Sequence, residues 1–281
     1  MQNATADGND RFIWTRGHGN DTIDDHSTSL TELDTLRLTD VSSNEVSLMR
    51  VNGTTHLTVN VLLTGENILA QYRFYSSTAG HGTETIEFSD GVIWDLERIL
   101  ANTAVNGTST AEVLTGTSYG DWMLGSGGND TLNGGTGDDT LDGGLGAHSL
   151  NGDAGADIVI YTTSLTAVQV NLAVTTAQIC AAGSAHAGDI LVSIEEVRGS
   201  AYGDYLVGNA TSNDIWGLTG DDILGGGDGY DRIYGGATNN YLVGGKGADL
   251  IDGGIGVDTF HFADCTIGND AITGLKNGRI F

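Results

Sequence analysis

The sequence predicts an all-β fold, a parallel β-roll of short stacked coils preceded by a strand-rich companion domain. Two observations carry this prediction. A nine-residue unit recurs in phase between residues 116 and 261, and the chain of 281 residues has 44 Gly and no Pro. Glycine supplies the positive φ angles that tight turns need, and a chain without proline keeps its backbone N–H groups available for strand ladders.

Residues 1–102 are predicted to form the companion domain. Apolar and polar residues alternate in several short segments, and this period of two predicts half-buried strands. The alternating apolar residues are Leu36, Leu38, Val46, Leu48, Leu57, Val59, Val61, Tyr72, Phe74, Ile86 and Phe88. The Asp90–Gly91 pair fits a hairpin turn, and Asp95 is expected to cap a short helix. Two imperfect repeat units surround Asp10 and Asp21, so Asp21 is a candidate metal ligand.

Residues 103–160 and 199–261 are predicted to form two blocks of the roll. Five units in phase start at Gly116, and seven more start at Gly199. Each unit splits into a six-residue glycine-rich turn and a three-residue strand, so two units complete a coil of 18 residues. The eighth position is apolar in every unit and therefore faces the core. Its residues are Met123, Leu132, Leu141, Leu150, Val159, Leu206, Ile215, Leu224, Ile233, Leu242, Ile251 and Phe260.

The sixth position of the unit supplies the candidate metal ligands. It is aspartate in nine units: Asp121, Asp130, Asp139, Asp157, Asp204, Asp222, Asp231, Asp249 and Asp258. The exceptions are Asn213, Asn240 and His148. Because neighbouring coils are 18 residues apart, these side chains are expected to face one another across a shared ion. The intact pairs are Asp121 with Asp139, Asp139 with Asp157, Asp204 with Asp222, and Asp231 with Asp249.

The oxygen-rich pairs point to several calcium ions. Ca²⁺ takes about six to eight oxygen ligands, whereas a transition metal calls for clustered His or Cys. Bound Ca²⁺ also offsets the formal net charge of −26. Asp130 faces His148, a poor calcium ligand, so a weak or empty site is predicted there. Pairs that contain Asn213 or Asn240 keep a carbonyl oxygen and lose one charge, which predicts weaker binding. The fifth-position acid Asp138 is assigned no role.

The segments outside the repeats complete the predicted architecture. Residues 161–198 interrupt the two blocks and alternate in polarity, which predicts a strand excursion at the side of the stacks. Residues 262–281 are expected to close the roll. The only cysteines, Cys180 and Cys265, have no metal-ligand spacing, and whether they pair is left open.

Charge and motifs exclude several classes of function. A net charge of −26 argues against nucleic acid and anionic membrane surfaces as partners. No apolar run approaches the length of about 18 residues that crosses a membrane. The chain has no HExxH motif, and its glycine-rich strings lack the lysine of a phosphate loop. The string GTSYG resembles a nucleophile elbow but lies inside a repeat. The sequence therefore predicts a protein that is not an enzyme.

The units GGTGDDTLD, GGDGYDRIY, GGKGADLID and GGIGVDTFH match the pattern GGxGxDxUx. The chain thus resembles the RTX, or haemolysin-type, calcium-binding repeat proteins. The strings GHGNDTI and IEFSDGVIWDL of the first hundred residues resemble the haemolysin-type calcium-binding-related domain. The resemblance implies a β-roll that folds on binding Ca²⁺ outside the cell. It also implies export by the type I secretion machinery of a Gram-negative bacterium.

Two alternative interpretations stay open. In the first, the chain is a fragment of an adhesin or surface-layer protein that contacts another copy, a cell surface or a polysaccharide. The outward aromatic residues that would form such a contact are Trp122, Trp216, Tyr205, Tyr234 and Tyr241. In the second, the roll is a calcium-binding module appended to a secreted enzyme such as a polysaccharide epimerase, a lyase or a lipase. Either way, the chain is interpreted as a piece of a larger protein, or as one with little beyond its repeats.

Overall fold

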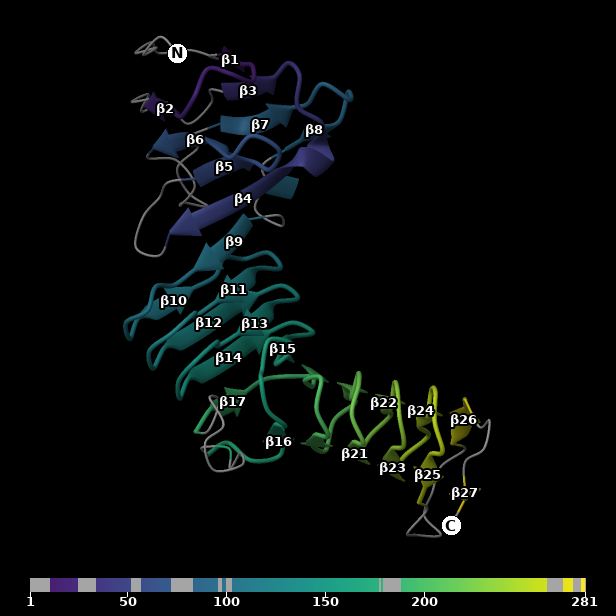
Figure 1. Cartoon of the computed structure of the whole chain (residues 1–281). Helices are drawn as coiled ribbons and strands as arrows, with labels where there is room; N and C mark the ends of the chain where they lie inside the picture. Colours follow the sequence, from purple (N-terminus) through teal and green to yellow (C-terminus); the bar gives the residue numbers. More distant parts are fainter. Residues whose placement is uncertain are drawn as a thin grey trace. The chain divides into compact units, whose positions relative to one another are not determined.

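The computed structural model describes residues 11–24, 34–51, 57–71, 83–95, 98–99, 103–176, 178, 188–261, 270–274 and 279–280. These residues are almost entirely β-strands (Figure 1). They divide into two compact units. Unit 1 comprises residues 1–106 and 119–122, and unit 2 comprises residues 107–118 and 123–281.

Unit 1 contains two sheets. The first has the order β1 (Arg11–Trp14), β3 (Asp34–Leu38), β7 (Thr83–Glu87), β8 (Ile93–Trp94). The second runs β2 (Asp21–Asp24), β6 (Glu66–Gln71), β5 (Leu57–Val61), β4 (Val46–Val51), β9 (Thr103–Asn106), and a 3₁₀ turn over Ser43–Glu45 precedes β4. Strands β4, β5 and β6 pair antiparallel, whereas β1 with β3 and β4 with β9 pair parallel.

The alternation seen in the sequence places the core of unit 1 correctly. The predicted inward residues from Leu36 to Val61, together with Ile86 and Phe88, are all buried in one cluster. Strands β7 and β8 form the expected hairpin, with Gly91 at φ +81° in its turn. Tyr72, Phe74, Asp10 and both cysteines lie outside the described residues.

Unit 2 is the roll, and all of its pairings are parallel. One sheet has the order β10 (Val113–Thr115), β12 (Thr131–Thr136), β14 (Ser149–Ala154), β17 (Ile190–Val192). The next has the order β16 (Gln169–Asn171), β19 (Tyr205–Val207), β21 (Ile223–Asp228), β23 (Tyr241–Lys246), β25 (Thr259–Phe260), β27 (Arg279–Ile280). After β11 (Trp122–Leu124), the last runs β13 (Thr140–Asp142), β15 (Ile158–Ile160), β18 (Glu196–Arg198), β20 (Asp214–Trp216), β22 (Arg232–Tyr234), β24 (Leu250–Asp252), β26 (Ala271–Thr273).

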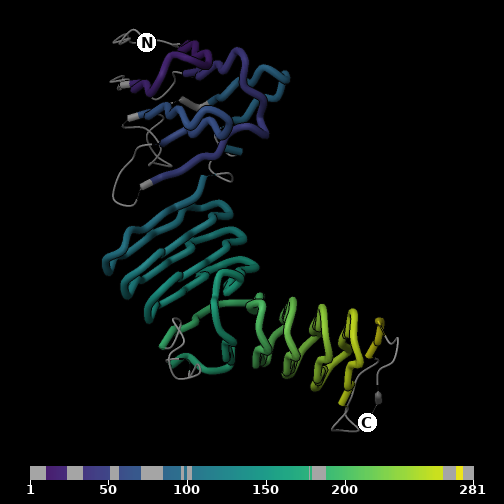
Figure 2. Tube along the Cα trace, viewed as in Figure 1, coloured from purple at the N-terminus to yellow at the C-terminus, as the bar shows by residue number. Residues whose placement is uncertain are grey.

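The coils stack with the period that the repeat predicts. In Figure 2 the green to yellow part of the trace climbs in successive coils. Leu224 of β21 lies beside Leu242 of β23, and Ile233 of β22 lies beside Ile251 of β24. All twelve eighth-position residues are fully buried, so the thin core predicted from that column is confirmed. The chain is therefore an all-β parallel roll with a strand-rich unit before it.

The segment between the blocks differs from the prediction. It is not a side excursion, because its strands continue the sheets of the roll: β17 pairs with β14, and β18 pairs with both β15 and β20. Strand β16 pairs with β19 at the edge of another sheet. Val168 and Val170 are buried there, so the insert contributes its own apolar side chains to the core. At the far end, β26 and β27 pair with β24 and β25.

Over the residues that the structure covers, no helix has both the length and the apolar character required to cross a membrane.

Candidate metal centre

The glycines of each turn have two separate structural roles. In the unit that starts at Gly226, the second and fourth residues, Gly227 and Gly229, have φ of +107° and +131°. L-residues rarely adopt this left-handed region, so both positions favour glycine. Gly226 is needed for space instead, because a Cβ on it would lie 2.3 Å from Oδ2 of Asp231 and 2.4 Å from the carbonyl oxygen of Gly244.

The sixth-position residues lie in three rows, each directly before the strands of one sheet. The first row is Glu112, Asp130, His148 and Asp189. The second row is Asp139, Asp157, Glu195, Asn213, Asp231, Asp249 and Asp270. The third row is Asp204, Asp222, Asn240 and Asp258.

Neighbours within a row are joined by a repeated hydrogen bond. The backbone N–H of one residue donates to a side-chain oxygen of the residue one coil later. The predicted pairs show it at 2.8 Å from Asp139 to Asp157, 2.7 Å from Asp204 to Asp222 and 3.0 Å from Asp231 to Asp249. The amide-containing pairs show it from Asn213 to Asp231, from Asp222 to Asn240 and from Asn240 to Asp258. The 18-residue register therefore brings these residues together as predicted.

Two predicted ligands stand apart from these rows. Asp121 is buried but belongs to unit 1, so its pairing with Asp139 stays a prediction. Asp21 starts β2, whose neighbour is β6 rather than a repeat strand. In the turn before Asp21, the N–H groups of Gly17 and Gly19 donate to the carboxylate of Glu66.

The two oxygens of a row carboxylate are used differently. Oδ1 accepts the backbone N–H of the preceding coil, so the two carboxylates do not meet face to face as the sequence suggested. Oδ2 is buried without a hydrogen-bond partner in Asp157, Asp222, Asp231, Asp249, Asp258 and Asp270. A buried acceptor that is left unsatisfied costs about 1–3 kcal/mol.

Each of these Oδ2 atoms borders the space that a first-position glycine leaves. At Gly226 the space is lined by Oδ2 of Asp231 and the carbonyl oxygen of Gly244. At Gly217 a Cβ would lie 2.4 Å from Oδ2 of Asp222 and 2.7 Å from the carbonyl oxygen of Gly235. Carboxylate and carbonyl oxygens that converge in this way are the donors that Ca²⁺ accepts. We call this arrangement the glycine cradle.

Burial makes the cradle carboxylates reluctant to ionise. It raises the pKa of Asp222 and of Asp231 to about 7, and the nearby carboxylate of Asp249 raises that of Asp231 further. Burial also raises the pKa of Asp157 to about 6, with Glu195 adding to the effect. Buried carboxylates with raised pKa values favour a compensating cation or a proton.

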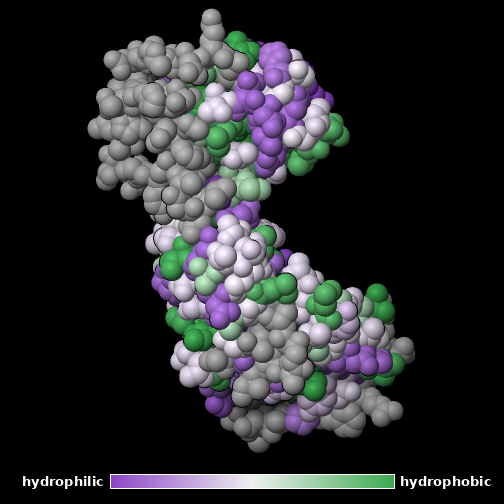
Figure 3. Space-filling model, turned by 60° about the vertical axis from the view of Figure 1, so that its left-hand side comes forward, coloured by the Kyte–Doolittle hydropathy of each residue, from purple (hydrophilic) through white to green (hydrophobic). Residues whose placement is uncertain are grey.

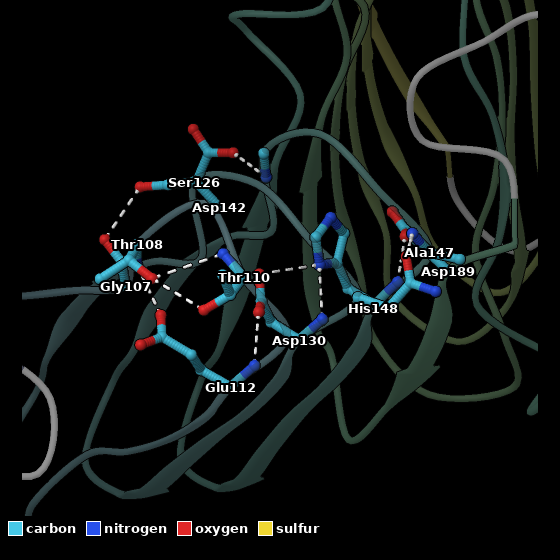
Figure 4. Close-up of polar contacts among 12 residues, drawn as sticks. Gly107, Thr108, Thr110, Glu112, Ser126, Asp130, Asp142, Ala147, His148 and Asp189 are labelled. Carbon is cyan, nitrogen blue, oxygen red and sulfur yellow. Dashed lines mark hydrogen bonds and ion pairs between the residues drawn. The ribbon is translucent and has the colours of Figure 1, made fainter.

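His148 occupies the place of an aspartate in the first row (Figure 4). Its Nδ1 accepts the backbone N–H of Asp130 at 3.2 Å and lies 3.4 Å from Oδ2 of the same residue. Burial lowers the pKa of His148, so the ring is neutral near pH 7. Since Nδ1 is the acceptor, Nε2 carries the proton. An N–H donor here opposes a cation, which supports the predicted weak or empty site.

Asn240 also differs from an aspartate in its cradle. Its Oδ1 accepts the N–H of Asp222 at 3.0 Å, as an aspartate would. Its Nδ2 lies 3.4 Å from the carbonyl oxygen of Gly253, on the side where an aspartate carries Oδ2. The amide therefore offers the cradle a donor, a stronger reason for weak binding than the lost charge alone.

Four acidic members of the rows escaped the sequence analysis: Glu112, Asp189, Glu195 and Asp270. The unit GTSTAEVLT, residues 107–115, fits the nine-residue ruler one step before Gly116, and that signal identifies Glu112. The other three follow irregular spacings that no fixed period finds. Asp189, for example, accepts the N–H of His148 at 2.8 Å and the hydroxyl of Tyr161 at 3.1 Å.

The fifth position also has a structural role, contrary to the sequence interpretation of Asp138. Oδ1 of Asp138 accepts the backbone N–H of Ala156, one coil later, at 2.9 Å. Asp221 accepts the N–H of Asn239 in the same way at 3.0 Å, and this bond lowers the pKa of Asp221. Fifth and sixth positions therefore tie neighbouring coils in opposite directions.

The cradles depend on backbone oxygens as well as carboxylates. In the part of the chain that the structure describes, no three His, Cys, Asp or Glu side chains gather into a set that would hold a metal ion by themselves. The carbonyl oxygens of Gly235 and Gly244 supply the additional ligand type.

Comparison with known proteins agrees with this geometry. The RTX calcium-binding nonapeptide repeat matches residues 115–147, 134–161, 198–233 and 234–263. A search of curated proteins gave no match. RTX nonapeptide repeats bind Ca²⁺. Through residues 115–161 and 198–263, the chain therefore belongs to the RTX calcium-binding repeat proteins.

Proposed function

We propose that Ca²⁺ binds in the glycine cradles and locks the coils of the roll, which acts as a structural module rather than a catalyst. One observation carries the proposal: buried Oδ2 atoms without a partner border a space lined by backbone carbonyl oxygens. A divalent cation satisfies both kinds of oxygen and offsets the carboxylate charge.

The residues that would hold calcium follow from the rows. Oδ2 of Asp222 with the carbonyl of Gly235, and Oδ2 of Asp231 with the carbonyl of Gly244, form the best-defined cradles. The same orphaned oxygen makes Asp157, Asp249, Asp258 and Asp270 candidates. Asp130 and Asp139 remain candidates from the repeat pattern.

Calcium binding would couple folding to location. The metal-free chain carries a net charge of −26 and a core one side chain wide, so its coils repel without a cation. Export through a type I secretion system into a calcium-rich exterior would then trigger folding. This setting, and a Gram-negative source, rest on the family resemblance.

A calcium titration of the whole chain tests the proposal. Far-UV circular dichroism and tryptophan fluorescence are expected to change together as Ca²⁺ is added, and to revert when a chelator is added. Trp216 reports on the roll because it stacks on Tyr234 with ring centroids 4.0 Å apart. A folded spectrum that is the same with chelator and with Ca²⁺ would contradict the proposed coupling.

A contact surface is the second candidate function. The outward residues of β19, β21 and β23 carry no charge, and Tyr205, Ile223 and Tyr241 are 46%, 45% and 38% exposed. On the face shown in Figure 3, hydrophobic residues otherwise lie in small groups among hydrophilic ones. Light scattering during the same titration tests the surface, because self-association predicts a rise in mass with Ca²⁺. A module appended to a secreted enzyme is also compatible with the repeats.

A further inference from the structure

Three turns of the roll differ from the others at the second position of the unit. Their second residues are Thr108, Ser200 and Asn209, in the turns 107–112, 199–204 and 208–213. None of these residues has a positive φ, whereas second residues elsewhere in the roll do. We call these three the closed turns.

The closed turns share one hydrogen-bond pattern. The backbone N–H of the second residue donates to the side chain of the sixth, from Thr108 to Glu112, from Ser200 to Asp204 at 2.6 Å, and from Asn209 to Asn213 at 2.8 Å. The side-chain oxygen of the second residue accepts the N–H of the fourth, from Thr110, Tyr202 and Thr211. The turn thus satisfies its own sixth-position side chain.

The remaining turns leave that side chain with an orphaned oxygen. Gly227 has φ +107°, and Oδ2 of Asp231 has no partner. Leu218 has φ +75°, and Oδ2 of Asp222 has no partner either. Since leucine behaves as glycine does here, the left-handed conformation of the second residue separates the two classes, rather than its identity.

Asp204 shows what closure does to a carboxylate in an otherwise intact cradle. Gly199 provides the same space as Gly226, with Oδ2 of Asp204 2.3 Å from a Cβ placed there. Yet Oδ1 of Asp204 accepts the N–H of Val168 and the hydroxyl of Ser200, both at 2.8 Å, and Oδ2 accepts the N–H of Ser200. Protein donors therefore already hold both oxygens.

We propose that the closed turns hold their coils without a cation, and that Ca²⁺ is confined to turns whose second residue is left-handed. The inference rests on the proposed calcium function and divides the cradles into two kinds. It removes Asp204 and Asn213 from the calcium ligands, although the repeat pattern includes them. Because the closed turns stand at the beginning of each block, each block starts with a coil that needs no metal.

Counting bound calcium in two matched variants tests this division. Asp204→Asn and Asp222→Asn each remove one charge, keep a hydrogen-bond acceptor and occupy successive places in one row. Equilibrium dialysis of the full chain is expected to give the parental number of ions for D204N and a smaller number for D222N. Circular dichroism in saturating Ca²⁺ confirms that both variants fold.

The outcomes separate this inference from the calcium proposal beneath it. Loss of an ion in D204N as well as D222N overturns the closed-turn inference and leaves calcium binding intact. An unchanged number in both variants contradicts calcium binding at Asp222, and with it the proposed function.

Opening a closed turn provides a second test. Ser200→Gly with Tyr202→Gly restores glycine at the second and fourth positions and frees Oδ2 of Asp204. We expect one additional bound ion. The matched control is Ser126→Gly, because Ser126 is already left-handed at φ +74° and its hydroxyl donates to the carbonyl of Gly107 rather than to Asp130. A gain in the control, or no gain in the double variant, contradicts the inference.

Discussion

At the scale of single residues, the first-position glycine is required for space rather than for backbone freedom. Any side chain there meets both a row carboxylate and the carbonyl of the next coil. The repeat pattern in the sequence marks this glycine as necessary. It does not distinguish it from the second-position glycine, whose requirement is a positive φ, because both appear simply as Gly.

Gly226→Ala is expected to remove one calcium site. Its Cβ would lie within 2.4 Å of two cradle oxygens, so neither the carboxylate of Asp231 nor a cation keeps its place. The control is Gly225→Ala in the preceding position, where a Cβ would touch only the methyl groups of Val207 at 4.0 Å. Isothermal titration calorimetry should show one fewer ion for G226A and the parental number for G225A. Equal stoichiometry in the two variants would count against the cradle.

At the scale of the elements, each strand of the roll contributes one buried side chain. The sequence revealed this because the eighth column is apolar without exception and turns with it recur every nine residues. The insert could not be placed in the same way. Strand β17 follows its neighbour β14 by 41 residues rather than 18, as in the pairing of Ile190 with Ser149, and a fixed period does not find such a partner.

Leu224→Ala tests the contribution of one such side chain. Leu224 is fully buried in β21 between Leu206 and Leu242, so its truncation leaves a cavity. The free energy of unfolding in saturating Ca²⁺ is expected to fall by about 2–5 kcal/mol. Ile223→Ala, on the outward face of the same strand, is expected to change it by about 0.5 kcal/mol. Urea denaturation measures both, and equal losses would contradict the one-sided core.

At the scale of the whole molecule, acid and calcium are expected to act on the same carboxylates. In the metal-free roll, burial raises the pKa of Asp222 and Asp231 to about 7 and that of Asp157 to about 6. The unfolded chain has ordinary values near about 3.9. A raised folded pKa contributes stability that is fully present below the unfolded value and is lost as pH rises through the folded one.

The chelated protein should therefore gain β-structure on acidification. Circular dichroism with chelator is expected to show more β-signal near about pH 5 than near about pH 8, with the loss centred at about pH 6–7 as the raised pKa values are passed. The double variant D222N/D231N should show a smaller pH dependence, since two of the titrating groups are gone. A metal-free spectrum that gains structure as pH rises would reverse the sign and contradict the assignment of these carboxylates.

The row hydrogen bonds also give the roll a polarity. Every link runs one way: the N–H of an earlier coil is received by a side chain of the coil that follows. A coil is thus completed by its successor, and the acceptor for Asp249 is Asp270, beyond the last repeat. Shortening the roll from its C-terminal end strands a buried donor at each new terminus, whereas shortening it from the other end leaves a carboxylate that water can solvate. The two ends of an apparently uniform stack are not interchangeable.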